Sequence, residues 1–184
     1  MLVLVLDLIC PLQARTSLYL EICAAACQAG TDVLREGGSA VEAAARATIV
    51  LEDAGETNAG YGSNLTESGT VEMDAGLMDG SSLLFGAVGA ISGVKNPILV
   101  AQRLVEEQQK GLLPLGRVPP GFLVGEGAKE WAVSETNIVP SQHDPFFSFP
   151  KAMMTHSFHA QVRHNIPTVK TETLISDKAA KLYR

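Results

Sequence analysis

The stretch that most constrains this chain is residues 57–80, "TNAGYGSNLTESGTVEMDAGLMDG", which is crowded with Gly, Asn, Ser and Thr. The segments on either side of it are rich in apolar residues. Gly and Asn tolerate the positive φ values that tight loops need. Two interpretations follow: a long turn, or a site where the main chain passes close to a ligand.

Two helices are predicted before this stretch. Apolar positions recur at helical spacing over residues 18–33, and a Gly-Gly pair follows. Ser39 and Glu42 then form the capping box of a second helix, rich in Ala, that reaches about Leu51. The predicted buried positions of the first helix are Leu18, Ile22, Ala25, Ala26, Ala29 and Val33.

Strands and two further helices are predicted after the loop. "GTVEMDAG" alternates apolar and acidic residues, which predicts a strand with one solvated face. "SLLFGAVGAI" is continuously apolar, which predicts a strand covered on both faces. Asn96 as cap and Pro97 in the first turn begin another helix. "GFLVGEGAKEWA" predicts a short strand leading into a short helix, so the whole is a layered α/β arrangement. The predicted buried positions of the third helix are Ile98, Ala101, Leu104 and Val105.

The composition is that of one globular domain. The chain has 184 residues, of which 46% are hydrophobic, enough for a substantial core. A net charge of -6 without a Lys/Arg cluster argues against nucleic acid as a direct partner. The opening "MLVLVLDLICPL" is too short to cross a bilayer and lacks the basic region of a signal peptide. We predict a buried strand there, or the edge of an incomplete gene model, and no membrane association.

The three cysteines, Cys10, Cys23 and Cys27, are too few and too irregular for a disulfide framework. Cys23 and Cys27 lie four residues apart on the first predicted helix. At this spacing the two thiols could supply half of the ligands of a metal site. No second pair completes it, so we predict buried thiols in a reducing compartment.

Two other polar groups have competing interpretations. One group is the carboxylates of Glu72, Asp74 and Asp79. They could act as an acid–base pair, but we prefer to interpret them as residues on a solvated strand face and in a turn. The other group is His143, His156, His159 and His164, some of which are spaced as in zinc sites. We interpret them as surface residues, because no acidic residue or Cys accompanies them. No Gly-x-Ser-x-Gly or Gly-x-Gly-x-x-Gly motif occurs.

Several short blocks occur in a distinctive order. They are Asn58-Ala59-Gly60 with Gly62-Ser63, Glu72-Met73-Asp74-Ala75, Met78-Asp79-Gly80, Gly86-Ala87-Val88 and Asn96-Pro97. Over about residues 18–134 the chain thereby resembles the asparaginase type 2 family of N-terminal nucleophile hydrolases. Within it, "QKGLLPLGRVPPGFLVGEGAKEWA" and "YLEICAAACQ" look most like the threonine aspartases (taspases), proteases that cut after Asp. Asparaginases have a shorter link before "LVGEGA".

The resemblance implies an αββα sandwich, of which this chain is the N-terminal, alpha-subunit half. Asn58 matches a residue that helps to hold the reacting carbonyl oxygen, and its amide offers donors to an oxyanion; the alternative is that Asn58 only holds a turn. Gly60 and Ser63 match the substrate-binding part of the loop. Backbone carbonyls at Leu51 and Glu52 match a segment that cradles a sodium ion, although hydration would serve them equally. No other cofactor is implied.

The family nucleophile has no counterpart in the sequence. It is a Thr at the start of a Thr-Val-Gly-Ala-Val-like strand, freed by self-cleavage, with its own α-amine as base. Gly69-Thr70-Val71 lies inside the first-subunit block, and Thr168-Val169 leads into Lys170 rather than Gly-Ala-Val. Neither qualifies, so the chain is predicted to be inactive alone and to leave an Asp-Gly peptide uncut.

A truncated first subunit is therefore expected. It consists of an atypical N-terminus (residues 1–17), a core (18–135) and an irregular C-terminal segment (136–184). One function is a subunit of a threonine-type endopeptidase cleaving after Asp, with an isoaspartyl peptidase or L-asparaginase as the alternative. The other is a non-catalytic orphan subunit.

The partner in either case is a second (beta) subunit or a full-length copy, and the substrate is a protein or peptide with Asp. The resemblance implies an intracellular location, in cytoplasm and/or nucleus. Half a sandwich should leave the strand at "SLLFGAVGAI" near an open edge, which would favour association.

Overall fold

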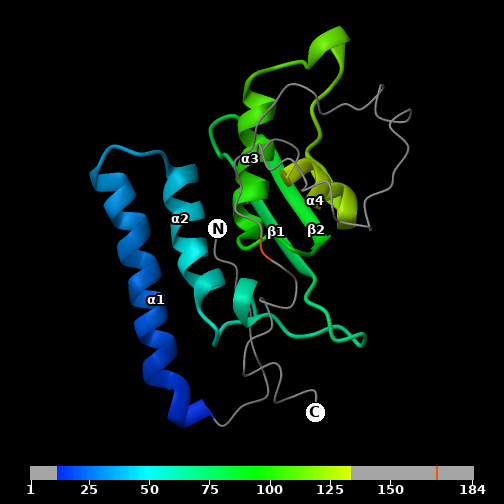
Figure 1. Cartoon of the computed structure of the whole chain (residues 1–184). Helices are drawn as coiled ribbons and strands as arrows, with labels where there is room; N and C mark the ends of the chain where they lie inside the picture. The colour runs from blue at the N-terminus through cyan, green and yellow to red at the C-terminus, as the bar shows by residue number, and fades with distance from the viewer. Residues whose placement is uncertain (1–11, 134–168, 170–184) are drawn as a thin grey trace.

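The computed structural model describes residues 12–133 and Val169. In this part of the chain, helices and a small mixed sheet alternate in the order that the sequence predicts (Figure 1). No described helix is long and apolar enough to cross a membrane. The elements are α1 (Leu12–Arg35), α2 (Ala40–Asp53), the 3-10 helix η1 (Gly60–Gly62), β1 (Met73–Met78), β2 (Phe85–Ile91), α3 (Pro97–Gln109), the 3-10 helix η2 (Pro114–Gly116), β3 (Phe122–Val124) and α4 (Gly125–Val133).

The sheet has the strand order β1-β2-β3. β1 and β2 are antiparallel, and β2 and β3 are parallel, with Ala87 opposite Phe122. The β1–β2 register shifts between Met73 and Ala75, where Asp74 Oδ1 accepts a hydrogen bond from the Ala90 amide at 2.8 Å. β2 is therefore the central strand of the described sheet. This strand, expected near an open edge, is not itself an edge strand of the described sheet, because β3 pairs with it, but it lies next to both edge strands.

Helices α3 and α4 pack on one face of the sheet. The α3 backbone comes so close to β2 that a Cβ on Gly86 would lie against the Ala101 carbonyl. Val88, Leu104 and Trp131 contribute to one buried cluster, which Val169 also contacts. The Val169 amide donates to the Gly93 carbonyl at 3.1 Å. The four apolar α3 positions predicted from the sequence are all buried, as predicted.

The other face of the sheet is apolar, and no described helix packs on it. The Phe122 ring and the Val124 side chain lie 3.3 and 3.5 Å from the point where a Gly89 Cβ would stand, so they share that face. The exposed fractions are 46% for Met78, 47% for Phe85, 58% for Phe122 and 56% for Val124. We call these four residues the open sheet face. The prediction that β2 is covered on both faces holds for the buried residues 86–89, but not for Phe85 and Ala90, which are exposed.

Helix α1 lies beside α2, away from the sheet (Figure 1). The capping box of α2 is confirmed: Glu42 N donates to Ser39 Oγ and Ser39 N to Glu42 Oε2, at 3.2 and 2.7 Å. The helices approach closely at Gly30, whose Cβ would lie 3.0 Å from the Ala43 carbonyl. The predicted boundary at residue 17 falls inside α1, which begins at Leu12.

The predicted buried stripe of α1 is wrong in part. Ala26 is buried, but Leu18 and Ala25 are exposed, because among the described helices and strands α1 packs mainly on α2. Cys23 and Cys27 are also exposed free thiols rather than buried ones. Cys10 lies outside the described residues.

Candidate functional site

The segment between α2 and the first strand contains the residues that the sequence singled out. We call residues 54–64 the Asn58 loop. Asn58 is half-buried, and its Oδ1 accepts a hydrogen bond from the Asn64 amide at 2.8 Å. Its Nδ2 makes no hydrogen bond within the part of the chain that the structure describes. The oxygen of Asn58 thus holds a turn, as the structural interpretation expected, while its two N–H donors stay available for a ligand.

Two glycines let this loop fold back on the end of α2. Gly60 has φ +53°, and a Cβ there would lie 2.6 Å from the Glu52 Cβ. A Cβ on Gly62 would lie 2.8 Å from the Ala54 carbonyl oxygen and 2.9 Å from that of Gly55. Side chains are excluded at both positions. Asn58, Gly60 and the buried Ser63, all predicted from the sequence, therefore lie in one tightly folded loop.

Backbone oxygens converge inside the Asn58 loop. The carbonyls of Ala54, Gly55 and Thr57 are the three nearest atoms to the Cβ position of Gly62. Neutral oxygens gathered in this way suit a hard cation. The Leu51 and Glu52 carbonyls, which were predicted to hold a sodium ion, are not part of this group. The Leu51 carbonyl accepts a hydrogen bond from Thr57 Oγ1 at 2.5 Å, and the Glu52 carbonyl faces Gly60. The described residues contain no cluster of three or more His, Cys, Asp or Glu side chains that could hold a metal ion.

The side chain of Glu52 is a feature that the sequence analysis missed. It is 3% exposed, and its Oε1 accepts from the Ile98 amide at 3.0 Å, whereas Oε2 has no hydrogen-bond partner. Burial raises the pKa of Glu52 to about 7, against the lowering effect of the hydrogen bond from the Ile98 amide. Nothing in "LED" at a helix end distinguishes a buried carboxyl from a solvated one.

Glu52 also changes the expected cap of α3. Asn96 occupies the cap position, but its side chain makes no capping hydrogen bond and instead donates to Asp53 Oδ1 at 3.0 Å. Glu52 accepts from the first turn of α3 in its place. Lys95 adds an ion pair to Asp53 at 3.0 Å. The end of α2, from which the Asn58 loop starts, is thereby fixed to the beginning of α3.

The other candidate groups are structural or lie outside the described residues. Asp79 closes the β1–β2 turn by accepting from the Ser82 hydroxyl at 2.6 Å, and this bond lowers its pKa. Glu72 and Asp74 are exposed, so the solvated interpretation of the carboxylates holds. Thr70 is bonded within its own turn to Thr66. Thr168 and the four histidines are not among the described residues.

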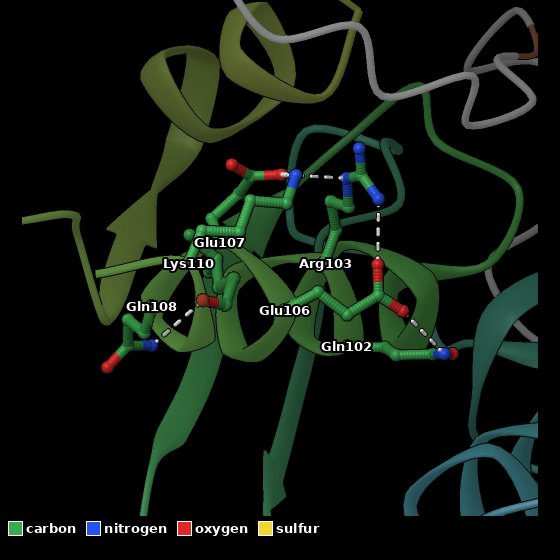
Figure 2. Close-up of polar contacts among 7 residues, drawn as sticks. Gln102, Arg103, Glu106, Glu107, Gln108 and Lys110 are labelled. Atoms are coloured by element: carbon green, nitrogen blue, oxygen red, sulfur yellow. Dashed lines mark hydrogen bonds and ion pairs between the residues drawn. The ribbon is translucent and has the colours of Figure 1, made fainter. Parts of the chain in front are cut away.

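A second polar cluster lies on α3 (Figure 2). Glu107 is buried between Arg103 Nε at 3.2 Å and Lys110 Nζ at 2.6 Å. Arg103 also contacts Glu106 at 2.8 Å, and Glu106 accepts from Gln102 at 2.9 Å. Every charge in the cluster has an opposite partner on α3 or at its C-cap, Lys110. We interpret it as a structural network that neutralises a buried carboxylate.

The comparison with known proteins identifies the family. A family model described as asparaginase matches residues 12–153. The chain belongs to the asparaginase family. The isoaspartyl peptidase/L-asparaginase of Homo sapiens is 44% identical over 105 residues, which are 57% of this chain and 31% of that protein. The Mus musculus protein of the same name is 42% identical over 118 residues, covering 64% and 33%. The putative isoaspartyl peptidase/L-asparaginase of Dictyostelium discoideum is 41% identical over 107 residues, covering 58% and 28%.

These matches confirm the asparaginase family and do not show the narrower threonine aspartase interpretation. The chain spans about a third of the length of the curated relatives it matches. These relatives are named isoaspartyl peptidase/L-asparaginase, which was the alternative to the threonine aspartase interpretation. An α/β architecture with a small mixed sheet is consistent with the asparaginase family.

Proposed function

We propose that this chain contributes the Asn58 loop to a hydrolase that cleaves isoaspartyl peptide bonds and the side-chain amide of asparagine. Family membership and the names of the relatives support the reaction class. The observation that carries the proposal is the arrangement of Asn58. Its oxygen is anchored by the Asn64 amide, and its nitrogen is left free to donate.

In the proposed reaction, a threonine hydroxyl attacks the substrate carbonyl, with the α-amine of the same threonine as base. The N–H groups of Asn58 donate to the carbonyl oxygen as it acquires negative charge. Such a donor contributes about 3 kcal/mol of transition-state stabilisation. The bond to the Asn64 amide fixes the side chain of Asn58 beforehand, so little reorganisation is needed. Gly60 and Ser63 complete the substrate-binding part of the loop.

The threonine comes from a second subunit or a full-length copy, because no Thr in this sequence begins the required strand. The open sheet face is where we place that partner. Four large apolar side chains are about half exposed on it, and a second sheet would bury them as in the αββα sandwich of the family. The chain alone is inactive on this proposal. We also infer an intracellular location, in cytoplasm and/or nucleus, since Cys23 and Cys27 are free thiols.

A structural monovalent cation is a further part of the proposal. The carbonyl oxygens of Ala54, Gly55 and Thr57 would hold it, and the Leu51 and Glu52 carbonyls lie in the preceding turn. The ion would supply no chemistry to the reaction. It would balance the converging carbonyl dipoles and so hold the loop that carries Asn58.

A second candidate function is an endopeptidase that cleaves after Asp. It is favoured by the link between α3 and β3, where Leu112, Leu115 and Val118 are exposed and could contact a protein substrate. A third is the non-catalytic orphan subunit, which would use the same partner surface without turnover.

The test is to purify the chain alone and in complex with the mature second subunit of a family member. Three substrates are compared: a β-aspartyl dipeptide, L-asparagine and a peptide containing Asp-Gly. We expect the chain alone to be inactive and the complex to hydrolyse the first two. Cleavage of only the Asp-Gly peptide would favour the endopeptidase, and a stable complex without any turnover would favour the orphan subunit.

A further inference from the structure

One contact of α1 reaches the Asn58 loop directly. Tyr19 Oη donates a hydrogen bond to the backbone carbonyl of Glu56 at 3.1 Å, across 37 residues of sequence. Tyr19 is half-buried, although most of α1 around it is exposed. The site residues considered so far come from α2, the loop and α3. Tyr19 has no part in that set, although it begins the "YLEICAAACQ" segment of the resemblance.

The carbonyl that Tyr19 binds lies between two carbonyls that point elsewhere. The oxygens of Gly55 and Thr57 are directed towards Gly62, whereas the Glu56 oxygen is directed outwards to Tyr19. The Thr57 amide reaches the Ala54 carbonyl only at 3.4 Å, whereas the Thr57 hydroxyl donates to the Leu51 and Ala54 carbonyls at 2.5 and 2.9 Å. The tyrosine hydroxyl is therefore one of several contacts that hold this segment, and its loss would loosen the Glu56–Thr57 peptide group. Loosening at this point would reach Thr57 and, next to it, Asn58.

We propose that Tyr19 is a positioning residue for the Asn58 loop. Its hydroxyl fixes the orientation of the Glu56–Thr57 peptide group, and through it the carbonyl cluster at Gly62 and the side chain of Asn58. The catalytic consequence rests on the proposed function, whereas the effect on the loop does not. A hydrogen bond with a purely structural role would instead stabilise the whole domain evenly.

Hydrogen exchange on the full 184-residue chain separates these two roles. Tyr19→Phe removes only the hydroxyl, and the ring keeps its place. The reporters are loop amides with defined acceptors: Gly62 to the Ala59 carbonyl at 3.0 Å, and Asn64 to Asn58 Oδ1 at 2.8 Å. We expect their exchange to become about tenfold faster in Tyr19→Phe, the effect of losing one ordinary hydrogen bond. Exchange along α2 should stay unchanged.

Thr31→Val is the matched control. Thr31 also lies on α1, and its hydroxyl donates to a backbone carbonyl, that of Cys27, at 2.7 Å. This bond is internal to the helix and does not touch the loop. The control should leave exchange at Gly62 and Asn64 as in the wild type. Unchanged loop exchange in Tyr19→Phe, or equal acceleration in the loop and in α2, would overturn the proposal.

A kinetic measurement on the active complex adds a second readout. If the wild type hydrolyses a β-aspartyl dipeptide, we expect Tyr19→Phe to lower kcat at least fivefold and to leave KM within a factor of about two. An unchanged kcat together with faster loop exchange would confine the role of Tyr19 to the loop and refute its catalytic consequence. A wild-type complex without turnover would contradict the proposed function, and the exchange result would still decide whether Tyr19 positions the loop.

Discussion

The buried carboxyl of Glu52 makes the stability of this fold depend on pH in a defined direction. Because burial raises its pKa from 4.5 to about 7, the folded chain binds a proton that the unfolded chain has released over that range. The stabilisation is complete below pH 4.5 and is lost as the pH rises through 7. The shift is equivalent to about 3 kcal/mol of unfolding free energy.

Glu52→Gln removes this dependence with little change in shape. The Gln side-chain oxygen can still accept from the Ile98 amide, and its NH2 group replaces the oxygen that has no partner. The variant therefore resembles the protonated wild type at every pH. We expect wild type and variant to have similar stability at pH 4.5, and the variant to be more stable by about 3 kcal/mol at pH 8.

Urea unfolding at pH 4.5, 6, 7 and 8 measures the difference. The buffers contain no sodium or potassium, so that cation binding to the loop does not vary with pH. Glu126→Gln is the control, because it also removes one carboxylate but from an exposed side chain paired with Lys129 at 2.9 Å. The reasoning is refuted if the wild-type and Glu52→Gln curves run parallel over this range, or if Glu126→Gln reproduces the effect.

Three further changes test the loop and the partner surface. Gly62→Ala places a Cβ among three carbonyl oxygens, so we expect a loss of about 2 kcal/mol of stability and new proteolytic cuts in the Asn58 loop. Gly80→Ala is the control, because nothing lies within 4 Å of that Cβ position, and it should show neither effect. Asn58→Asp keeps an oxygen for the Asn64 amide but removes the side-chain N–H donors. The kcat of the active complex should therefore fall about 100-fold, while the melting temperature stays near that of the wild type. A normal kcat would exclude the oxyanion role of Asn58. Phe122→Glu puts a charge on the open sheet face, so analytical ultracentrifugation should show loss of the second subunit, and unchanged association would place the partner elsewhere.

Local patterns in the sequence predicted the elements and their order. The Ser39–Glu42 capping box, the apolar stripe of α3 and the β3–α4 transition are all present, because each depends on residues within a few positions of one another. The dense Gly and Asn content of residues 57–64 likewise located the candidate site. Gly60 and Gly62 are required there because no side chain fits where the loop meets α2.

Contacts between distant segments could not be predicted in this way. Whether Asn96 caps its own helix depends on Glu52 and Asp53, more than 40 residues earlier, which compete for the same groups. The exposure of Cys23 and Cys27 follows from α1 packing mainly on α2 within the described part of the chain, a fact that helical periodicity does not contain. The sequence also gave no sign that Tyr19 reaches the Glu56 carbonyl.

What the sequence by itself determined was the family, the succession of helices and strands, and the loop that carries Asn58. What only the tertiary structure decided was the surroundings of each group: a buried carboxyl at Glu52, an apolar sheet face left open, and a tyrosine holding the loop from outside. The reason is physical. Secondary structure follows from interactions along a few residues, whereas burial, pKa and hydrogen-bond partners depend on which distant segments fill the remaining space.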